Sequence, residues 1–432
     1  MPSSRLSPKS LLSLVLCCST LFADAQNPDT IYYPPIRSPQ LFAYGNQLGY
    51  PIIRLNSGDR LELQFDDLDA DVKNLSYTYV LCNADWTPAQ LTEFDYIRGF
   101  SQARIPGYKF SSMGLTRYTH YHAVIPDPNC VPIRSGNYLL KVFADGDTSR
   151  LAFTRRFLVA EDGVTIGAQI LLPFGPDLSR THQKLQFTIN MRGLNISSPT
   201  QQIKVVILQN HRWDIARRNI RPTFYSGNNM QFTSDDDYNF AAGKEWRWLD
   251  IQSLRYHSDR IQRVNTSKTS TDVYLVPDAD RSRQPYYFYK DYDGQYFIQT
   301  TESVNPNWQT DYATVHFSFV PPGNSPFPDK DVYLLGQMTD YSLSDSTKMR
   351  FNAEHGVYET AQFLKQGFYN YSYVTVNATD PDRIPSFDFT EGNNQETEND
   401  YLILVYYRDL TGRADQLVGM ADLNTLNGRG QP

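Results

Sequence analysis

The first residues that could carry chemistry form an acidic run at 66–71, which contains four aspartates. Hard cations such as Ca²⁺ are bound by several carboxylate oxygens, so the run is a candidate metal loop. An EF-hand loop counted from Asp67, however, has Val72 where the sharp-turn glycine belongs and Thr78 where the bidentate glutamate belongs. The pattern therefore favours the solvated end of a strand over a metal site.

Two histidines, His120 and His122, would share one face of a strand, because side chains alternate along it. They could bind a metal together, but no third ligand is nearby, and Tyr118 and Tyr121 are typical of an ordinary polar strand. The chain also lacks the nucleophile elbow, the phosphate-binding loop and the dinucleotide fingerprint. We therefore predict no enzyme activity, no catalytic residue, no metal and no cofactor. A hydrolase whose carboxylates come from separate domains is the least supported alternative.

The N-terminus predicts export. Arg5 and Lys9 form a short basic region, an apolar stretch follows at 11–23, and Ala-Asp-Ala precedes Gln26. This arrangement is typical of a secretory signal peptide with cleavage between Ala25 and Gln26. The apolar stretch is too short to cross a membrane, and no later segment reaches the necessary length.

The four cysteines indicate how an exported chain could be modified, by acylation or by a disulfide. Cys17 and Cys18 lie in the apolar stretch, and acylation of either would give a lipoprotein, but Leu16 stands where a small residue is required. Cys82 and Cys130 belong to the exported chain, where an oxidising compartment could join them in a disulfide. The sequence equally allows one buried thiol in a strand and one thiol in a proline-rich loop.

The composition favours β structure. Aromatic residues are 14% of the 432 residues, mostly Tyr and Phe, which suit pleated and half-buried surfaces. The 24 Gly and 26 Pro suit a chain with many turns. The net charge is −7 and no basic block is present, which disfavours nucleic-acid binding.

Short alternating segments predict strands in three blocks. Candidates are at 60–65, 75–82, 118–125, 137–143 and 151–159; at 165–172, 184–191, 204–209, 230–233 and 272–276; and at 314–319, 331–335, 357–363, 368–376 and 401–407. We expect an all-β fold of three β-sandwich, immunoglobulin-like domains in series, with few short helices. The expected divisions are a signal peptide at 1–25 and domains at 26–162, 163–310 and 311–432.

Other local signals lie between these strands. Thr87 can cap a short helix that begins with proline. Asp293-Gly294 predicts a hairpin between strands at 286–292 and 295–301. The segment 241–257 is ambiguous between helix and loop.

Eight short motifs, in order along nearly the whole exported chain, resemble the Plug protein family of the type IX secretion system of Bacteroidota. They are LQFDDLDADV at 63–72, CNADW at 82–86, SGNYLL at 135–140, LQNHRWD at 208–214, SLRY at 253–256, FYKD at 288–291, KQGFYNY at 365–371 and ETENDY at 396–401. The resemblance implies a non-enzymatic periplasmic protein at the inner face of the outer membrane. Such a protein seals the periplasmic mouth of a large translocon barrel, which is its expected partner, and meets cargo or other secretion subunits only indirectly. The sequence does not identify the partner-binding residues.

The third block also resembles the early-set immunoglobulin-like modules that accompany starch- and glycogen-acting enzymes. The matching motifs are VYLLG at 332–336, GVYE at 356–359 and GFYNY at 367–371. Sugar-binding members usually have an exposed Trp after the first motif, and here Tyr341 stands at about that place. An exported glycan-binding β-sandwich protein is therefore the alternative function.

Overall fold

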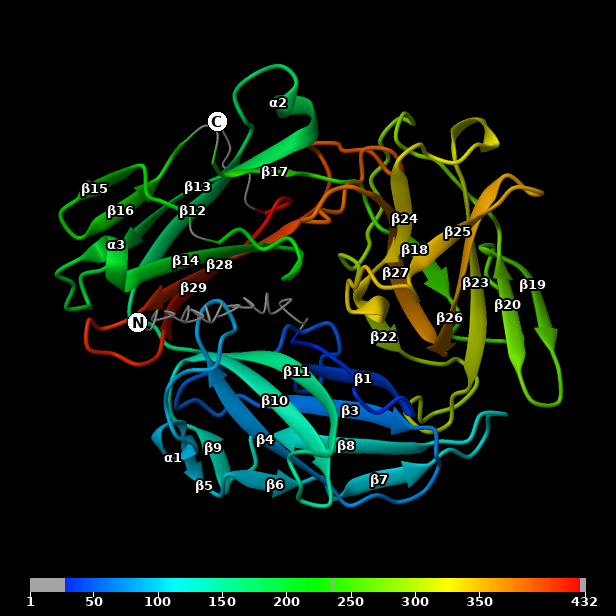
Figure 1. Cartoon of the computed structure of the whole chain (residues 1–432), viewed down its shortest axis with the longest axis horizontal. Coiled ribbons are helices and arrows are strands. Elements are labelled where there is room, and N and C mark those ends of the chain that lie inside the picture. The colour runs from blue at the N-terminus through cyan, green and yellow to red at the C-terminus, as the bar shows by residue number, and fades with distance from the viewer. Residues whose placement is uncertain (1–27, 219, 235–236, 428–432) are drawn as a thin grey trace, which may run out of the picture.

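The computed structural model describes residues 28–427 except 219 and 235–236. The predicted leader, with Cys17, Cys18 and the cleavage site at Ala25 and Gln26, lies outside the described residues. The described chain is mostly β and forms three units that meet around a common centre (Figure 1). Within it, no helix is both long and apolar enough to cross a membrane.

The first unit, residues 28–160, has two main sheets that share one core. One sheet has the order β1 (Ile36–Ala43), β3 (Leu61–Asp67), β8 (Thr119–Ile125), β7 (Gly107–Phe110). The other has the order β2 (Ile52–Arg54), β11 (Leu151–Ala160), β10 (Gly136–Ala144), β4 (Leu75–Cys82), β6 (Gln102–Arg104), while β5 (Ile97–Gly99) pairs with β9 (Cys130–Pro132). Alternate residues such as Leu61 and Leu63 point into the core, as the two-residue period of a strand requires.

The helix predicted after Thr87 is not observed. The Thr87 hydroxyl donates to Asp85 Oδ1 at 2.6 Å, which fixes a turn instead of capping a helix. The helix of this region is α1 (Glu93–Tyr96), where the Asp95 carboxylate accepts the Thr92 backbone N–H at 2.8 Å.

The second unit is assembled from two stretches of chain, residues 164–242 and 399–425. One sheet has the order β12 (Thr165–Leu171), β13 (His182–Asn190), β16 (Asn229–Phe232), β15 (Phe224–Ser226), with β17 (Asn239–Ala241) also paired to β13; the other has β14 (Ile203–Gln209), β28 (Asp400–Tyr407), β29 (Gln416–Asn424). Helices α2 (Leu178–Thr181) and α3 (Pro199–Gln202) are single turns. The strand at 401–407 was expected in the third block, and this placement is wrong. Its residues Ile403 and Val405 share a core with Phe187 and Ile207 of the second unit.

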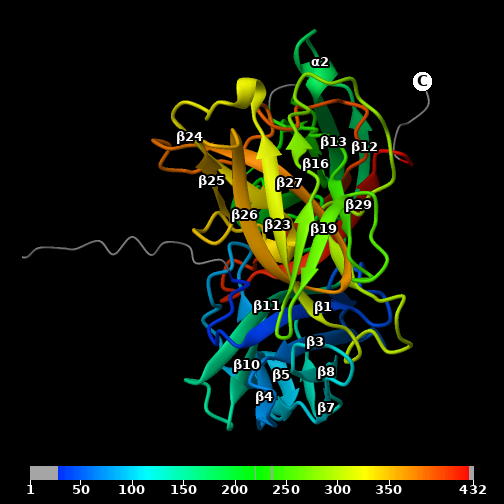
Figure 2. The same cartoon turned by 90° about the vertical axis from the view of Figure 1, so that its right-hand side faces the viewer.

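The third unit, residues 246–397, is one long curled sheet (Figure 2). Its order is β18 (Arg247–Asp250), β27 (Gly367–Asn377), β24 (Lys330–Leu335), β25 (Lys348–Asn352), β26 (Val357–Lys365), β23 (Tyr312–Val320), β20 (Thr271–Leu275), β19 (Ile261–Thr266). β21 (Asp278–Ala279) pairs with β23, β22 (Tyr296–Ile298) pairs with β27, and 3₁₀ turns lie at Pro322–Asn324 and Gln337–Thr339. The ambiguous segment 241–257 thus contributes strand β18. The expected division near residue 310 falls inside this sheet, because β18, β20, β21 and β22 pair with strands that follow residue 310.

The hairpin predicted around Asp293-Gly294 is also wrong, since residues 286–292 form no strand. Side chains hold that segment instead: the Tyr289 hydroxyl donates to the Trp246 carbonyl at 3.0 Å, and Asp291 accepts the Trp246 N–H. The segment is therefore anchored beside β18, and β22 is left to pair with β27.

Candidate interaction edge and the buried junctions behind it

The acidic run forms the junction between the first and third units. Asp66 is 1% exposed and accepts hydrogen bonds from Lys365 Nζ (2.5 Å) and Tyr312 OH (2.6 Å) of the third unit. On its other side it accepts one from His120 Nδ1 (2.7 Å). Burial raises the pKa of Asp66, but Lys365 and His120 outweigh burial and hold that pKa below its usual value. The expectation of a solvated strand end is therefore wrong for Asp66 and for buried Asp67.

The rest of the run is neutralised by a lysine. Oxygens of Asp67, Asp69 and Asp71 lie within 4.8 Å of one another, as they would around a metal. Lys73 Nζ contacts all three, at 2.5, 2.8 and 2.6 Å, and so provides the positive charge within the chain. His122, the second candidate histidine ligand, is exposed.

The junction between the first and second units joins two of the sequence motifs. Trp86 and Trp213 pack edge to face with centroids 4.9 Å apart, and the guanidinium of Arg156 lies 5.5 Å from each ring. Asp415, 1% exposed, accepts the Ala84 N–H at 2.9 Å across the same junction. These motif residues hold the units together rather than reaching solvent.

The junction between the second and third units is centred on Arg212, which is 3% exposed. Its guanidinium lies 5.8 Å from the Trp246 ring and 5.3 Å from the Tyr341 ring, and pairs with Asp214 at 2.6 Å. Tyr341, the position where a sugar-binding module would expose a Trp, is therefore packed under an arginine. Its ring is unsuited to stacking on a sugar.

Buried ion pairs also fasten the third unit internally. Arg247 pairs with Asp278 at 2.7 Å and with Glu391 at 2.9 Å, and Arg281 pairs with Glu391 at 2.7 Å. Burial raises the pKa of Glu391, but the two arginines outweigh it and hold the pKa at about 2. Glu391 is thus ionised at neutral pH although its side chain is 1% exposed.

Cys82 and Cys130 are both free and buried. Burial raises the pKa of each thiol to about 12. Neither is therefore a reactive thiolate at neutral pH.

One end of the first unit presents apolar side chains to solvent. This distal edge, residues 93–110, comprises α1, β5, β6 and β7 and faces away from the other two units (Figures 1 and 2). Phe94, Phe100 and Phe110 are 82%, 70% and 52% exposed. β6 and β7 are also the outer strands of their sheets, so the edge has backbone groups open to a partner.

The distal edge carries more basic than acidic side chains, although the protein as a whole is acidic with a net charge of −7. It contains Arg98, Arg104 and Lys109 against Glu93 and Asp95 of α1, and the overlapping segment 97–126 contains four basic (Arg or Lys) and no acidic residues. Arg98, Arg104 and Lys109 are exposed among the phenylalanines. Whole-chain composition concealed this edge, and a charge count over short windows would have found it.

A polar cleft of about 520 Å³ lies between the first and third units. Its lining includes Arg155 and Asp340, which pair at 3.3 Å, together with Gln337 and Ser344. The described lining residues include no histidine, cysteine or lysine. The cleft therefore offers hydrogen bonds to a polar ligand but no nucleophile activated by a base.

The described chain is thus mostly β, its charged and aromatic motifs form internal junctions, and one edge exposes apolar side chains. Residues 36–161 match the family model described as the first domain of type 9 secretion system plug proteins. The fold is similar to the crystal structure of a hypothetical protein from Parabacteroides merdae, with 30% identity, a TM-score of 0.87, and coverage of 92% of this chain and 99% of that one. The chain belongs to the type IX secretion system plug protein family, which is a structural component of secretion rather than a known enzyme family.

Two further comparisons add nothing to this assignment. A putative membrane anchored protein from Corynebacterium diphtheriae is 9% identical with a TM-score of 0.13, which carries no structural inference. No curated protein matches the chain.

Proposed function

We propose that the protein is a non-enzymatic plug that seals the periplasmic mouth of the type IX translocon barrel. Family membership gives the setting, and the observation that carries the proposal is the exposed, basic and aromatic distal edge. A barrel wide enough for folded cargo would leak small solutes, so its lumen must be blocked. The plug is exported, with cleavage between Ala25 and Gln26, and is held at the inner face of the outer membrane.

A plug must keep its shape under load, and the junctions support this. Asp66, Asp415 and Arg212 each join two units, so every unit is tied to both others. Removing one partner of a buried ion pair costs about 3–5 kcal/mol. We therefore expect the three units to move as one body.

The distal edge has the chemistry of a reversible contact. Phenylalanines give apolar area that can be buried, and flanking arginine and lysine residues select an acidic surface. We expect the barrel to present acidic groups beside an apolar rim. Such a contact is specific without being strongly apolar, so cargo can displace the plug.

Charge reversal tests the distal edge. The variant Arg98→Glu/Lys109→Glu should co-purify with the native barrel at least tenfold more weakly than the wild type, because it places like charges against the acidic surface. Lys268→Glu/Arg350→Glu is the matched control, since both residues are exposed on the third unit, and it should bind normally. If both variants co-purify equally well with the barrel, the distal edge is not part of the barrel contact.

The polar cleft supports the glycan-binding alternative. Arg155, Asp340 and Gln337 could hydrogen-bond a sugar, although aromatic stacking through Tyr341 is blocked. Titration with oligosaccharides should leave the tryptophan fluorescence of a plug unchanged. A saturable change would favour glycan binding.

A further inference from the structure

A second group of carboxylates lies where the second and third units meet. Asp291 and Asp293 belong to the turn before β22, and Glu398 comes just before β28. One oxygen from each lies within 4.8 Å of the other two. Unlike the run neutralised by Lys73, this group has no lysine or arginine bonded to its carboxylates within the described chain.

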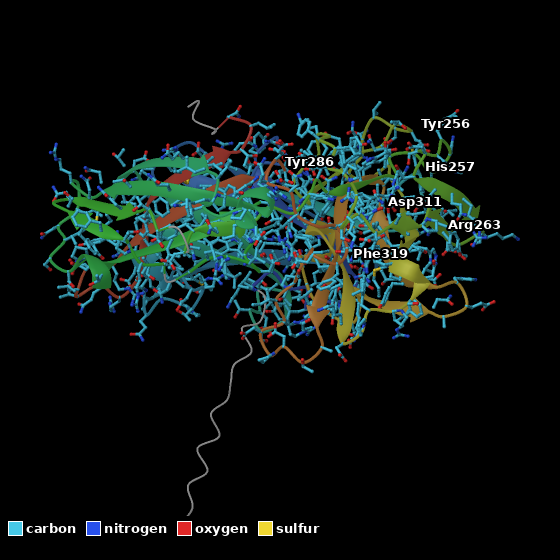
Figure 3. All side chains as sticks on the ribbon, turned by 90° about the horizontal axis from the view of Figure 1, so that it is seen from above. Tyr256, His257, Arg263, Tyr286, Asp311 and Phe319 are labelled. Atoms are coloured by element: carbon cyan, nitrogen blue, oxygen red, sulfur yellow. The ribbon has the colours of Figure 1, made fainter. Side chains whose placement is uncertain are left out.

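A fourth carboxylate beside the group has an unpaired oxygen. Glu245 is 2% exposed, and its Oε1 accepts the Glu398 N–H at 3.3 Å and the Tyr286 hydroxyl. Figure 3 places Tyr286 toward the middle of the molecule, on the inner side of the third unit. Glu245 Oε2 is buried and accepts no hydrogen bond from the described residues. A buried acceptor of this kind needs a ligand or a proton.

Asp293 also has a buried carboxylate oxygen without a hydrogen-bond donor among the described residues. It is 5% exposed, and its buried Oδ1 accepts no hydrogen bond in the described part of the chain. Asp291 is oriented differently, because its two oxygens accept the N–H groups of Asp293 and Trp246. Each carboxylate oxygen has a second lone pair, so these bonds fix the Asp291 side chain while leaving it able to bind a cation.

No neighbouring cation is hydrogen-bonded to these carboxylates in the described part of the chain, although Lys290 acts on Glu398 and Lys244 on Glu245 through their charge. Lys244 donates to the Arg281 and Gln284 carbonyls, and Arg281 directs its guanidinium to Glu391, to Tyr289 and to a backbone carbonyl. The group therefore gains from any positive charge placed among its oxygens.

We propose that Asp291, Asp293 and Glu398 bind a hard divalent cation, best matched by Ca²⁺, with Glu245 as the adjacent fourth carboxylate. An all-oxygen donor set is what Ca²⁺ prefers, and it is unsuited to softer metals. Because the ligands come from both sides of the junction, the ion ties β28 of the second unit to the third unit. Nothing in the plug function requires this site, so the two stand or fall separately.

Calcium titration of the full exported chain tests the proposal. After treatment with EDTA, added CaCl₂ should raise the Tm saturably, by about 3 °C at a hundred times Kd. Asp293→Asn should abolish this response and also raise the Tm in EDTA, because it removes repulsion and breaks no hydrogen bond. Asp69→Asn, in the run neutralised by Lys73, is the matched control and should respond as the wild type does. No Tm response in the wild type, or an undiminished one in Asp293→Asn, overturns the site.

Terbium luminescence gives an independent measurement that needs no ligand variant. Trp246 lies beside the turn, since a Cβ on Gly294 would touch its ring at 2.8 Å. Excited indole should therefore sensitise Tb³⁺ bound to the wild-type protein, and Ca²⁺ should displace the emission. Trp246→Phe should weaken the emission while the calcium-dependent Tm rise remains. Absence of displaceable emission contradicts the proposal.

Discussion

Replacing Lys365 with Met tests whether one buried ion pair fastens the first unit to the third. Lys365 is 1% exposed, and its Nζ lies 2.5 Å from Asp66 Oδ2 and 2.6 Å from the Asn307 carbonyl. The variant leaves Asp66 buried without its counter-charge, which costs about 3–5 kcal/mol. His120 and Tyr312 still donate to Asp66, so we expect about 3 kcal/mol, at the lower end of that range.

Urea unfolding at neutral pH, followed by tryptophan fluorescence, measures this cost. Asp66→Asn/Lys365→Met should recover at least half of the loss, because the double variant buries no charge. Lys348→Met is the matched control: its pair with Asp331 spans 2.8 Å but is over a third exposed on the lysine side, so the loss should stay below about 1 kcal/mol. A loss below about 1 kcal/mol for Lys365→Met, or strictly additive single variants, would refute this account of the junction.

Three further outcomes follow from the buried groups. The pKa of Glu391 is held at about 2, below its usual 4.5, so ionised Glu391 stabilises the folded state above pH 4.5. This contribution to the free energy of unfolding, about 3 kcal/mol in total, is lost as the pH falls toward 2. Glu391→Gln should make stability less dependent on pH in that window, and an unchanged acid-unfolding profile would count against the pairing. Cys82 and Cys130 should react with a thiol reagent only after denaturation, so fast labelling of the native protein, or none after denaturation without reductant, would contradict the free buried thiols. Gly99→Ala should cost about 1–3 kcal/mol, because φ is +98° and a Cβ would lie 2.1 Å from the Asn129 carbonyl oxygen; Gly58→Ala, in open space, is the control in thermal unfolding.

Local pattern was sufficient to find most of the long strands. The alternation in β4 and β10 follows directly from a core on one face, and both strands appear within a residue or two of the prediction. Short edge strands such as β6 and β7 are not predicted, since three or four residues are too few to show a two-residue period. A two-residue period in the sequence predicts a strand only when one face of the strand is buried, and little of β6 and β7 is buried.

The sequence did not predict which strands distant in the chain pair with each other. Strand β28 was located correctly but assigned to the wrong neighbours, because nothing in residues 400–407 encodes pairing with β14 almost two hundred positions earlier. Asp293-Gly294 does form a turn, but side chains near Trp246 hold the preceding segment away from a hairpin. Tertiary contacts overrode local propensity in both cases.

The site was only partly predictable. The motifs that carried the family resemblance proved to be junction residues, such as Trp86 and Trp213, rather than exposed contacts. The acidic run predicts a solvated strand end, and this fails for Asp66 because its cation, Lys365, lies 299 positions away in the sequence and reaches it only through the fold. The distal edge could have been found from the sequence, as its basic residues lie close together in an otherwise acidic chain.

The central claim, that the protein seals a translocon barrel, is tested most directly by barrel conductance. Barrels isolated from native outer membranes are inserted in a planar bilayer, and conductance is recorded before and after addition of the exported chain. The account predicts that the wild type closes the barrel, that Arg98→Glu/Lys109→Glu leaves it open, and that Lys268→Glu/Arg350→Glu closes it normally. Conductance that does not change when the wild-type protein is added or removed would contradict the claim.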